Sequence, residues 1–371
     1  MIENIDESIR AGTLKGKRLS YIETGRSPRL PAEILQGPTP PHMISAPDIV
    51  WPQRSIYELE EVEVIGGYSA ALITSNSQLI GELSPDVFGA RNHELFGRFK
   101  TPKPTKLSGR SLLLATPEAA GNFSHWLFDL LPRLSAVEAA GQSLSTFDHY
   151  IVNSYQAGFQ IDSLNTYGIP KERIHLLGPK DAFSCESVCL SNLRQDHWKE
   201  SLNPSDMEQV REKLLSQSRV CTQKYPKRIW LSRKDVPFRR LLNEAELEPL
   251  LSKYGFETFI PEQFSLREQA EAFRNADIIA GPHTSAMCNW MYCKEGTPVI
   301  EIASPYHKDI SFWTIASHAK LHYTALLGEV DSKNNSTIGT RFIDFRVDPD
   351  RLEHYLLMFT KHESRAIGGD N

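Results

Sequence analysis

Residues 278–302 read IIAGPHTSAMCNWMYCKEGTPVIEI. The apolar run at 278–280 predicts a buried strand, and the apolar run at 298–302 predicts another. Between them a Gly-Pro pair predicts a sharp turn, and residues 285–292 predict a helix. A strand, a helix and a second strand in this order are typical of parallel strands joined by a crossover helix.

The same alternation precedes this unit. Strands are predicted at 228–232 and 256–260, and helices at 243–253 and 266–275, so that strand and helix alternate along the chain. The C-terminal half is therefore predicted to be an α/β domain with a parallel sheet. Ligands of such sheets bind beyond the carboxyl ends of the strands, so the residues that follow 232, 280 and 302 are the candidates for binding.

The N-terminal half shows weaker patterns. Residues 61–83 predict a small β-rich region of antiparallel strands, and an alternation then begins with strands at 111–115 and 149–152 and a helix at 122–139. Six prolines from 31 to 52 leave the first residues unassigned. We predict three regions: an N-terminal arm at 1–60, an N-terminal α/β domain on the acceptor side at 61–203, and a C-terminal Rossmann-like domain at 204–371, whose last helix is the candidate to pack back on the N-terminal domain.

The composition is that of a soluble globular protein. The 371 residues are 40% hydrophobic and 23% charged, and this length predicts two domains. The formal charge of −5 provides no overall field for nucleic acid or for an anionic membrane, so any anion site is local. Five cysteines without a C-x-x-C pair argue against a disulfide framework and favour a reducing cytosol. The chain contains no apolar stretch of about 18 residues and no apolar leader, so we expect neither a membrane span nor secretion.

One predicted helix carries all its ionisable groups on one face. At about 100° per residue from Asn122, His125 lies at about 300°, Asp129 at about 340° and Arg133 at about 20°, whereas the apolar side chains lie opposite. Pro132 is expected to kink the last turn. His125 and Asp129 can hydrogen-bond, which orients the imidazole and raises its basicity. The alternative is a buried His-Asp-Arg network that only fixes packing.

A basic segment follows the first strand of the C-terminal half. Arg233, Arg239 and Arg240 come just beyond the carboxyl edge of the predicted sheet, where phosphate groups are commonly held. Arg233 is the candidate diphosphate ligand, and the alternative is a solvated surface loop. Asn243 suits a helix N-cap with Glu246 closing a capping box, which is a structural role.

The turn after residue 280 is a second candidate anion site. The first amides of the following helix would point at a ligand there, and Thr284 and Ser285 add hydroxyl donors. His283 lies at the turn itself. Glu301 lies at the end of an apolar strand, where a carboxylate can accept hydrogen bonds from ribose hydroxyls. The alternative is a short strand-to-helix loop with capping hydroxyls and an exposed histidine.

Two possible metal motifs are rejected. Asp348-Pro-Asp350 has the D-x-D spacing of metal-dependent sugar transferases, but it lies outside any strand end and is typical of a turn that caps a helix. Cys185 and Cys189 have no nearby His or Cys pair to complete four zinc ligands. No metal site is therefore expected.

Taken together, these segments resemble glycosyltransferase family 61, the group that includes bacterial capsular polysaccharide proteins, plant xylosyltransferases and animal O-linked transferases. The resemblance covers roughly residues 60 to 330 and rests on the order and spacing of its motifs: GNFSHWLFDLLPRL at 121–134, Ser232-Arg with Arg239-Arg-Leu-Leu-Asn-Glu, Pro261-Glu with Gln269 and Phe273, Gly281-Pro-His with Asn289, Val299-Ile-Glu, and Phe312-Trp-Thr-Ile-Ala with Tyr323. It implies a GT-B architecture of two Rossmann-like domains facing a cleft, a nucleotide sugar held mainly by the C-terminal domain, and inverting transfer without a D-x-D metal.

The resemblance also implies roles for individual residues. His125 and Asp129 are the catalytic candidates, either of them the base, with Asn122 and Arg133 on the acceptor side of the cleft. Together with the pattern analysis, it makes the donor-binding candidates Arg233, Arg239, Arg240, His283, Thr284, Ser285 and Glu301. One position departs from the family, which usually has Gly where this chain has Thr284, and a Cβ there is expected to narrow the phosphate turn or to change the choice of donor.

The expected function is therefore an inverting, metal-independent hexosyl- or pentosyltransferase of capsular or extracellular polysaccharide synthesis. Its donor would be a nucleoside diphosphate sugar, its acceptor a glycan or glycolipid, and it would need no cofactor and bind no nucleic acid. A cytoplasmic location is expected, with peripheral attachment at the inner membrane as an alternative. Two other functions stay open. One is a non-catalytic GT-B-like nucleotide- or glycan-binding protein of a polysaccharide assembly complex, which Thr284 favours. The other is a sugar-nucleotide epimerase on the same scaffold.

Overall fold

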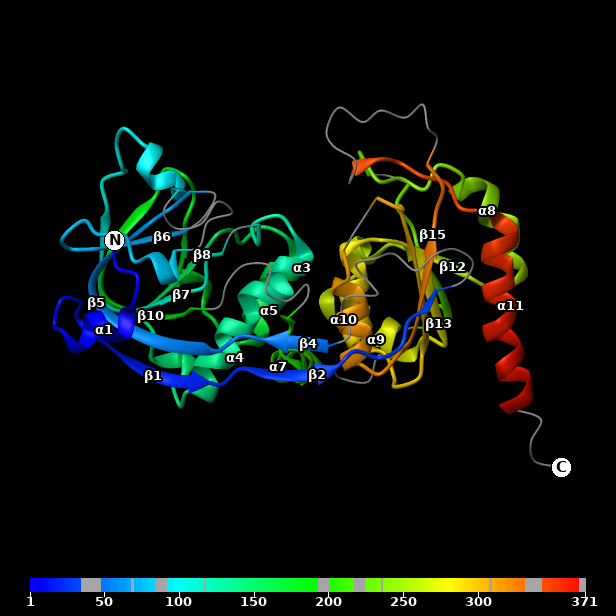
Figure 1. Cartoon of the computed structure of the whole chain (residues 1–371), viewed down its shortest axis with the longest axis horizontal. Coiled ribbons are helices and arrows are strands. Elements are labelled where there is room, and N and C mark those ends of the chain that lie inside the picture. Colours follow the sequence, from blue (N-terminus) through cyan, green and yellow to red (C-terminus); the bar gives the residue numbers. More distant parts are fainter. Residues whose placement is uncertain are drawn as a thin grey trace. The chain divides into compact units, whose positions relative to one another are not determined.

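The computed structural model describes residues 1–34, 48–67, 70–84, 92–116, 118–192, 201–216, 224–234, 236–306, 309–330 and 342–366. The chain divides into two compact units, and each is described by itself (Figure 1). Unit 1 comprises Met1–Arg26 and Val50–Gln217, and unit 2 comprises Ser27–Ile49 and Ser218–Asn371. Both are α/β, as predicted from the sequence.

Within the described residues, unit 1 is built on a sheet in the order β1-β5-β10-β7-β8-β9, with β6 paired to β5. Strands β10, β7, β8 and β9 run parallel, and β5 is antiparallel to β1, β6 and β10. The strands are β1 (Gly16–Ile22), β5 (Arg54–Ile65), β6 (Ala71–Thr74), β7 (Thr105–Leu113), β8 (His149–Val152), β9 (Ile174–Leu176) and β10 (Ala182–Ser191). The helices are α1 (Ile5–Arg10), η1 (Gly81–Leu83), η3 (Glu94–Gly97), α3 (Phe123–His125), η4 (Trp126–Leu130), α4 (Leu131–Ala139), η5 (Leu144–Thr146), α5 (Gly158–Thr166), η6 (Lys171–Arg173) and α7 (Pro204–Leu215).

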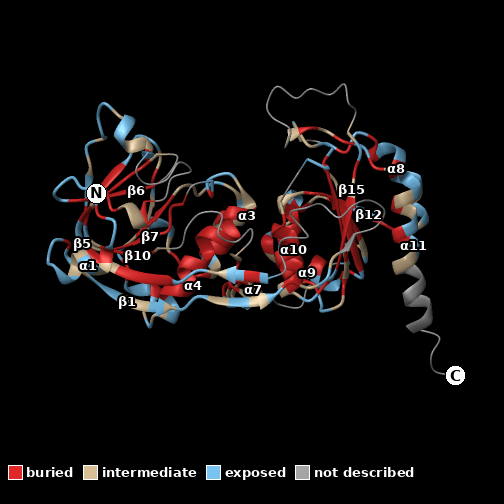
Figure 2. Ribbon diagram, in the orientation of Figure 1, coloured by how far each residue is buried: buried red, intermediate tan, exposed pale blue. Residues whose placement is uncertain are grey.

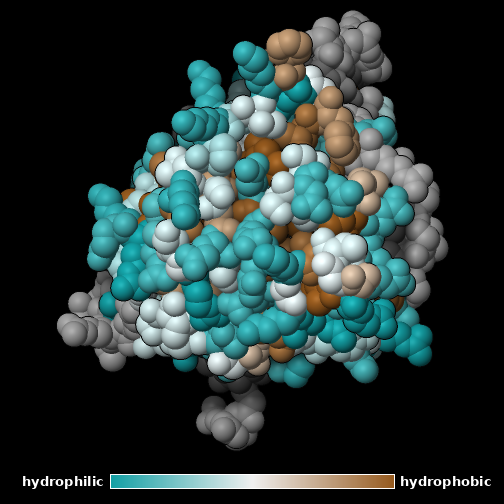
Figure 3. All heavy atoms as spheres, turned by 90° about the vertical axis from the view of Figure 1, so that its left-hand side faces the viewer, coloured by the Kyte–Doolittle hydropathy of each residue, from teal (hydrophilic) through white to brown (hydrophobic). Residues whose placement is uncertain are grey.

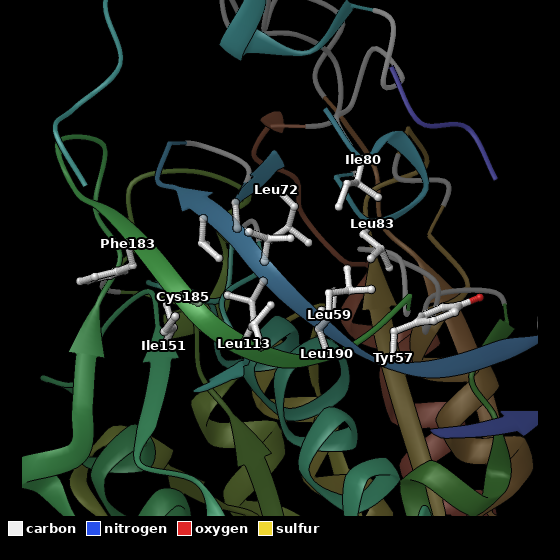
Figure 4. Packing of buried hydrophobic residues seen from close by; sticks show 14 of the residues in the cluster. Tyr57, Leu59, Leu72, Ile80, Leu83, Leu113, Ile151, Phe183, Cys185 and Leu190 are labelled. Atoms are coloured by element: carbon white, nitrogen blue, oxygen red, sulfur yellow. The ribbon is translucent and has the colours of Figure 1, made fainter. Parts of the chain in front are cut away.

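The core of unit 1 lies against this sheet. Leu59, Leu113 and Leu190 come from the neighbouring strands β5, β7 and β10 and belong to one cluster with Leu72 and Ile80 (Figure 4). The antiparallel pairing predicted within 61–83 is confirmed by β5 and β6. It is not a separate region, however, because β5 extends back to residue 54 and is an inner strand of the whole sheet.

Unit 2 contains a parallel sheet in the order β12-β11-β13-β14-β15-β3, which confirms the predicted alternation. Its strands are β3 (Glu33–Ile34), β11 (Arg228–Leu231), β12 (Glu257–Phe259), β13 (Ile278–Pro282), β14 (Pro298–Ala303) and β15 (His322–Leu327). Its helices are α8 (Glu244–Lys253), η7 (Pro261–Gln263), α9 (Leu266–Asn275), η8 (Ser285–Tyr292), α10 (Ser311–His318) and α11 (Pro349–Ala366). Where the chain passes between the units, β2 (Gly25–Pro28) pairs with β4 (Asp48–Trp51).

The strand order of unit 2 locates a binding crevice. From β11 onward the strands follow the doubly wound order 2-1-3-4-5, and helices cover both faces, α9 and α10 on one and α8 and α11 on the other (Figure 1). The winding direction changes between β11 and β13, and ligands of such sheets bind at the carboxyl ends of the two strands at this point. Gly281 allows these strands to pack closely, because a Cβ there would lie 2.5 Å from the carbonyl oxygen of Leu231.

The helix predicted at 122–139 is present, and nearly all of it is buried (Figure 2). It is not uniform, because the π-helical turn η4 separates α3 from α4. Pro132 has no N–H to donate to the carbonyl of Phe128, and its ring would clash with that carbonyl in a regular α-helix. A wider turn directly before the proline relieves this clash, so the predicted kink takes the form of a π-helical turn.

The helix predicted at 285–292 is confirmed as η8, which is a 3-10 helix buried over almost its whole length. The capping box predicted at Asn243 is wrong. Asn243 precedes α8 but makes no capping hydrogen bond, because its amide pairs with the backbone of Val347 in both directions, at 2.8 and 3.1 Å. The expected partner Glu246 instead pairs with Arg346 at 2.6 Å.

One helix belongs to a unit other than the one expected from the sequence. Helix α7 is part of unit 1, although residues from 204 onward were expected in the C-terminal domain; its buried Asp206 lies 2.5 Å from Arg54 of β5. Helix α11 belongs to unit 2, in agreement with its place in the predicted C-terminal domain, and joins the core of that unit through Leu352, Tyr355 and Leu356. The predicted connection at 218–227 lies mostly outside the described residues.

The Arg54–Asp206 pair gives a stability prediction. Both side chains are almost fully buried, so Asp206→Asn leaves an uncompensated buried cation, which costs about 3–5 kcal/mol of unfolding free energy. We expect the Tm to fall by about 8–15 °C in a thermal unfolding scan. The exposed pair of Lys320 and Glu295 serves as the control, and Glu295→Gln should change the Tm by less than about 2 °C. An unchanged Tm in Asp206→Asn would show that the pair does not hold α7.

Candidate active site

The charged face predicted on the unit 1 helix is present and buried. His125 and Asp129 are 2% and 0% exposed, and Nδ1 of His125 lies 2.5 Å from Oδ2 of Asp129. The predicted hydrogen bond between them is therefore confirmed. Asn122 caps the helix, because its side-chain oxygen accepts a hydrogen bond from the backbone N–H of Ser124 at 3.0 Å.

Glu118 is a third member of this cluster that sequence reasoning missed. Its Oε2 lies 2.8 Å from Nε2 of His125, and 36% of its side chain is exposed. Glu118 lies in the loop after β7 with a backbone φ of 63°, in the left-handed region. Because the contact depends on this loop conformation, the helical periodicity that groups His125 with Asp129 could not find it.

Two carboxylates thus flank one imidazole. Burial opposes a charge on His125 and is the largest single influence, but the hydrogen bonds and charges of Asp129 and Glu118 together outweigh it and raise the pKa of His125 to about 9. At neutral pH the ring therefore carries a proton on each nitrogen. One is directed at a fully buried carboxylate and the other at a partly exposed one, so proton exchange with a ligand is open only at Nε2.

Arg133 has a structural position. Its Nε donates to the backbone oxygen of Asp129 at 2.9 Å, and its Nη1 donates to the backbone oxygen of Ser191, at the end of β10, at 3.2 Å. Burial lowers its pKa to about 10 even though the charge of Asp129 acts in the opposite direction. These bonds tie the helix to the sheet, and Arg133 is 6% exposed.

In unit 2, Arg233 follows β11 at the point where the winding direction changes. Its side chain is 8% exposed, and among the described residues it has no carboxylate within salt-bridge distance. Its side chain makes one hydrogen bond, from Nη2 to the backbone oxygen of Phe238 at 3.2 Å, and its buried Nε has no partner. Burial and the charge of Arg239 lower its pKa to about 10, although the more distant charges of Glu262, Asp344 and Glu244 act in the opposite direction. Because buried cations are normally paired, this one indicates a site for an anion.

The other two arginines of the basic segment are placed differently. Arg239 has a backbone φ of 54°, and its guanidinium lies 5.9 Å from the ring of Phe238. Arg240 is exposed and bound to Asp344 through both its Nε and its Nη2, at 3.0 and 2.7 Å. It also lines a cavity of about 210 Å³ at the end of β11, together with Lys234. With its guanidinium engaged, Arg240 is not kept among the diphosphate ligands proposed below.

His283, directly after the end of β13, is in contact with Glu301, which lies within the adjacent strand β14. Nδ1 of His283 lies 2.5 Å from Oε1 of Glu301, and the other carboxylate oxygen accepts a hydrogen bond from the Tyr323 hydroxyl at 2.7 Å. Burial and the neighbouring charge of Glu301 raise the pKa of Tyr323 well above its usual value, so it stays a neutral donor. Glu301 is 2% exposed and uses both oxygens inside the protein. The arrangement orients His283, and it does not leave Glu301 facing a ribose as the sequence analysis expected.

The departure at Thr284 imposes no backbone strain. Its φ of −148° and ψ of 151° are extended values that any residue adopts, so glycine is not required at this position. Thr284 precedes η8, whose first residue is Ser285, and the Thr284 hydroxyl makes no capping hydrogen bond there. Both predicted hydroxyls therefore follow His283 directly, at the carboxyl end of β13.

Two further observations concern metals and membranes. Among the described residues, no group of three or more His, Cys, Asp or Glu side chains could hold a metal ion. Asp348 accepts a hydrogen bond from the backbone N–H of Asp350 at 2.9 Å, which confirms the predicted turn at the start of α11. In the part of the chain that the structure describes, no helix is long and apolar enough to cross a bilayer.

Comparison with known proteins matches part of the chain to a family. Residues 123–300 match the model of the family described as Glycosyltransferase 61, so the resemblance found in the motifs is confirmed. No curated protein matches the chain. Among solved structures, the bacterial iron-containing dodecameric glycosyltransferase TibC from enterotoxigenic E. coli H10407 is similar at 12% identity, over 67% of this chain and 75% of that chain, with a TM-score of 0.27. A TM-score of this size does not show a shared fold.

Proposed function

We propose that this chain, a glycosyltransferase with a family 61 domain, moves a sugar from a nucleoside diphosphate sugar to a hydroxyl of a glycan or glycolipid with inversion at the anomeric carbon. The observation that carries the proposal is the buried Arg233 guanidinium, which has no carboxylate partner among the described residues and follows β11 at the change of winding direction. A diphosphate supplies the missing negative charge, and arginine matches its oxygens with two parallel N–H donors. In the GT-B arrangement that the family resemblance implies, unit 2 would hold the donor and unit 1 the acceptor.

The proton transfer is assigned to His125. Inversion requires a base that takes the proton of the acceptor hydroxyl while its oxygen attacks the anomeric carbon and the bond to the diphosphate breaks. Asp129 is fully buried and bound to Nδ1, which supports a role in orienting His125 and argues against Asp129 as the base. In this mechanism the acceptor displaces Glu118 from Nε2, the imidazole releases its Nε2 proton to solvent, and the neutral ring then accepts the acceptor's proton.

The leaving diphosphate takes the electron pair of the broken bond and carries the developing negative charge. Arg233 would stabilise this charge from a site that excludes most water, where a fixed cation is most effective. His283, held in one orientation by Glu301 and Tyr323, and the hydroxyls of Thr284 and Ser285 would donate further hydrogen bonds. In this proposal the transfer needs neither a metal nor a cofactor, because these side chains supply the positive charge and the hydrogen-bond donors for the leaving diphosphate.

Product analysis tests this function. Purified protein is incubated with a panel of nucleoside diphosphate sugars and oligosaccharide or lipid-linked acceptors, with and without EDTA. We expect free nucleoside diphosphate and an elongated glycan in equal amounts, an inverted anomeric configuration by NMR, and activity that survives EDTA. An epimerised donor would assign the chain to a sugar-nucleotide epimerase. Binding without turnover on the full panel would favour a non-catalytic protein of a polysaccharide assembly complex, and a strict need for Mn²⁺ would overturn the metal-independent step.

The biological setting is part of the same proposal. Capsular or extracellular polysaccharide synthesis follows from the family resemblance, and a nucleotide sugar donor is available in the cytoplasm. The extended backbone at Thr284 does not require glycine, which supports an intact donor turn. Activity on a polysaccharide repeat as acceptor is the result that would support this role.

A further inference from the structure

The segment around η3 is held firmly to the sheet of unit 1. His93 is 1% exposed, and its Nδ1 accepts a hydrogen bond from the backbone N–H of Leu95 at 3.1 Å. Leu95 packs against a small buried cluster that includes Ile65 and Ile73. Arg98 donates to the backbone oxygen of Gly66 at 2.6 Å. The backbone of this segment, the cyan helix at the top of unit 1 in Figure 1, is therefore fixed on its inner side.

Two phenylalanines of this anchored segment point away from the protein. Phe96 is 60% exposed and Phe99 is 97% exposed, which makes them the two most exposed large hydrophobic side chains in the part of the chain that the structure describes. The helix is coloured exposed and intermediate in Figure 2. Figure 3, which looks at this side of the molecule, shows brown side chains at several places among teal and white ones. Exposed aromatic side chains on a fixed backbone indicate a surface that is covered in use.

The same segment is strongly basic. Residues 95–106 contain Arg98, Lys100, Lys103 and Lys106 and no Asp or Glu, although the whole chain has a net charge of −5. The three lysines are exposed and form no ion pair with the described residues. The nearest acidic side chain along the chain, Glu94, is paired with Arg98 at 3.4 Å. The positive charge of the lysines is therefore available to an anionic partner.

We propose that residues 95–106 dock unit 1 on the surface of an anionic lipid bilayer. Phosphate-bearing headgroups attract the lysines, and Phe96 and Phe99 insert at the boundary between headgroups and acyl chains, where aromatic side chains are favoured. A soluble polyanion would satisfy the lysines but would leave both phenylalanine rings in water, so the combination of charges and rings selects a membrane. Docking of this kind needs no membrane-spanning helix, and it holds independently of the proposed function.

Co-sedimentation with vesicles tests the proposal. The full chain is mixed with vesicles of pure phosphatidylcholine or of phosphatidylcholine with 30% phosphatidylglycerol. We expect at least about tenfold stronger partition onto the anionic vesicles, and its loss in 1 M NaCl. Phe96→Ser with Phe99→Ser should weaken partition by about 100-fold, or tenfold for each ring. Lys100→Gln with Lys103→Gln should weaken it by about 25-fold.

The control is a pair of exposed apolar residues elsewhere in unit 1, Tyr21 and Leu176, whose replacement by Ser should leave partition unchanged. All variants should keep the wild-type Tm, because each side chain is exposed. Equal binding to neutral and anionic vesicles, or full binding by the Phe96→Ser, Phe99→Ser variant, would overturn the proposal. A wild-type dimer that this variant converts to a monomer in sedimentation equilibrium would assign the surface to a second copy of the chain instead.

Discussion

His125→Gln should lower turnover by about 10²–10⁴-fold while changing the Kd of the nucleotide sugar by less than about threefold. A positioned base contributes a factor of this size, and glutamine fills a similar volume but cannot accept the proton of the acceptor. The measurement is steady-state turnover together with donor binding by calorimetry. Asp129→Asn should reproduce most of the loss, because its carboxylate is hydrogen-bonded to Nδ1 of His125 at 2.5 Å and orients the ring.

His149→Gln is the matched control. His149 is a partly buried histidine on β8 of the same unit, hydrogen-bonded to His175 at 2.9 Å, and it plays no part in the proposed mechanism. Its replacement should leave turnover within about twofold of wild type. If His125→Gln retained wild-type turnover with an unchanged Tm, the base would have to be another group, and the cluster of Glu118, His125 and Asp129 would be structural.

The raised pKa of His125 gives this prediction a pH dependence. Because His125 of the free enzyme stays protonated up to about pH 9, kcat/KM should rise with pH below that value. Glu118→Gln removes one of the two carboxylates that raise the pKa of His125, so the rise in kcat/KM should occur at lower pH. The stability changes in the opposite direction. His125 has a higher pKa in the folded protein than its unfolded value of about 6.5, so its protonation stabilises the fold. This contribution is complete below about pH 6.5 and is lost as the pH rises through about 9. His125→Gln should lose less unfolding free energy between these limits than wild type.

Arg233→Met should weaken nucleoside diphosphate binding by about 30- to 100-fold, because it removes a charge-assisted pair of hydrogen bonds worth about 2–3 kcal/mol. It should also stabilise the free protein by about 1–3 kcal/mol, since methionine replaces a buried cation that has no carboxylate partner in the described residues. Replacement of a purely structural arginine would destabilise the protein and leave nucleotide binding unchanged. The opposed changes in stability and binding therefore distinguish a ligand site from a packing interaction.

Arg240→Met is the matched control for this variant. The sequence places Arg240 at the same edge as Arg233, but its guanidinium is exposed and bound to Asp344. Its loss should leave the Kd of the nucleotide within about twofold and the unfolding free energy within about 1 kcal/mol. A weakening of nucleotide binding as large as that in Arg233→Met would show that Asp344 releases Arg240 to the ligand.

The periodic parts of the chain could be predicted from sequence because their patterns report burial directly. The parallel sheet of unit 2 follows from apolar runs separated by helical segments, and the contact of His125 with Asp129 follows from a spacing of four residues in a helix. The motifs also identified the family, over the part of the chain that its model matches. In these cases local pattern and tertiary structure agree.

The predictions that failed concern residues whose partners lie far away along the chain or in a loop. Asn243 is well suited to capping, yet Val347, 104 residues further along, offers its amide two backbone hydrogen bonds. Glu301 is predicted at the end of an apolar strand, where a ribose ligand would lie, but β14 continues to Ala303, and His283 and Tyr323 on the next strand occupy both carboxylate oxygens. Glu118 contacts His125 from a loop in which its own backbone is left-handed. No local pattern encodes such pairings, so only the folded structure reveals them.

Thermal unfolding with nucleoside diphosphates most directly tests whether unit 2 holds the diphosphate of a sugar donor through Arg233. Wild type and Arg233→Met are unfolded with and without each nucleotide, in EDTA. We predict that at 100 times its Kd one class of nucleoside diphosphate stabilises wild type by about 2.7 kcal/mol. Arg233→Met should start from a higher Tm and show almost no shift at the same concentration. No shift of wild type with any nucleotide, or an equal shift in Arg233→Met, would contradict a donor site at Arg233.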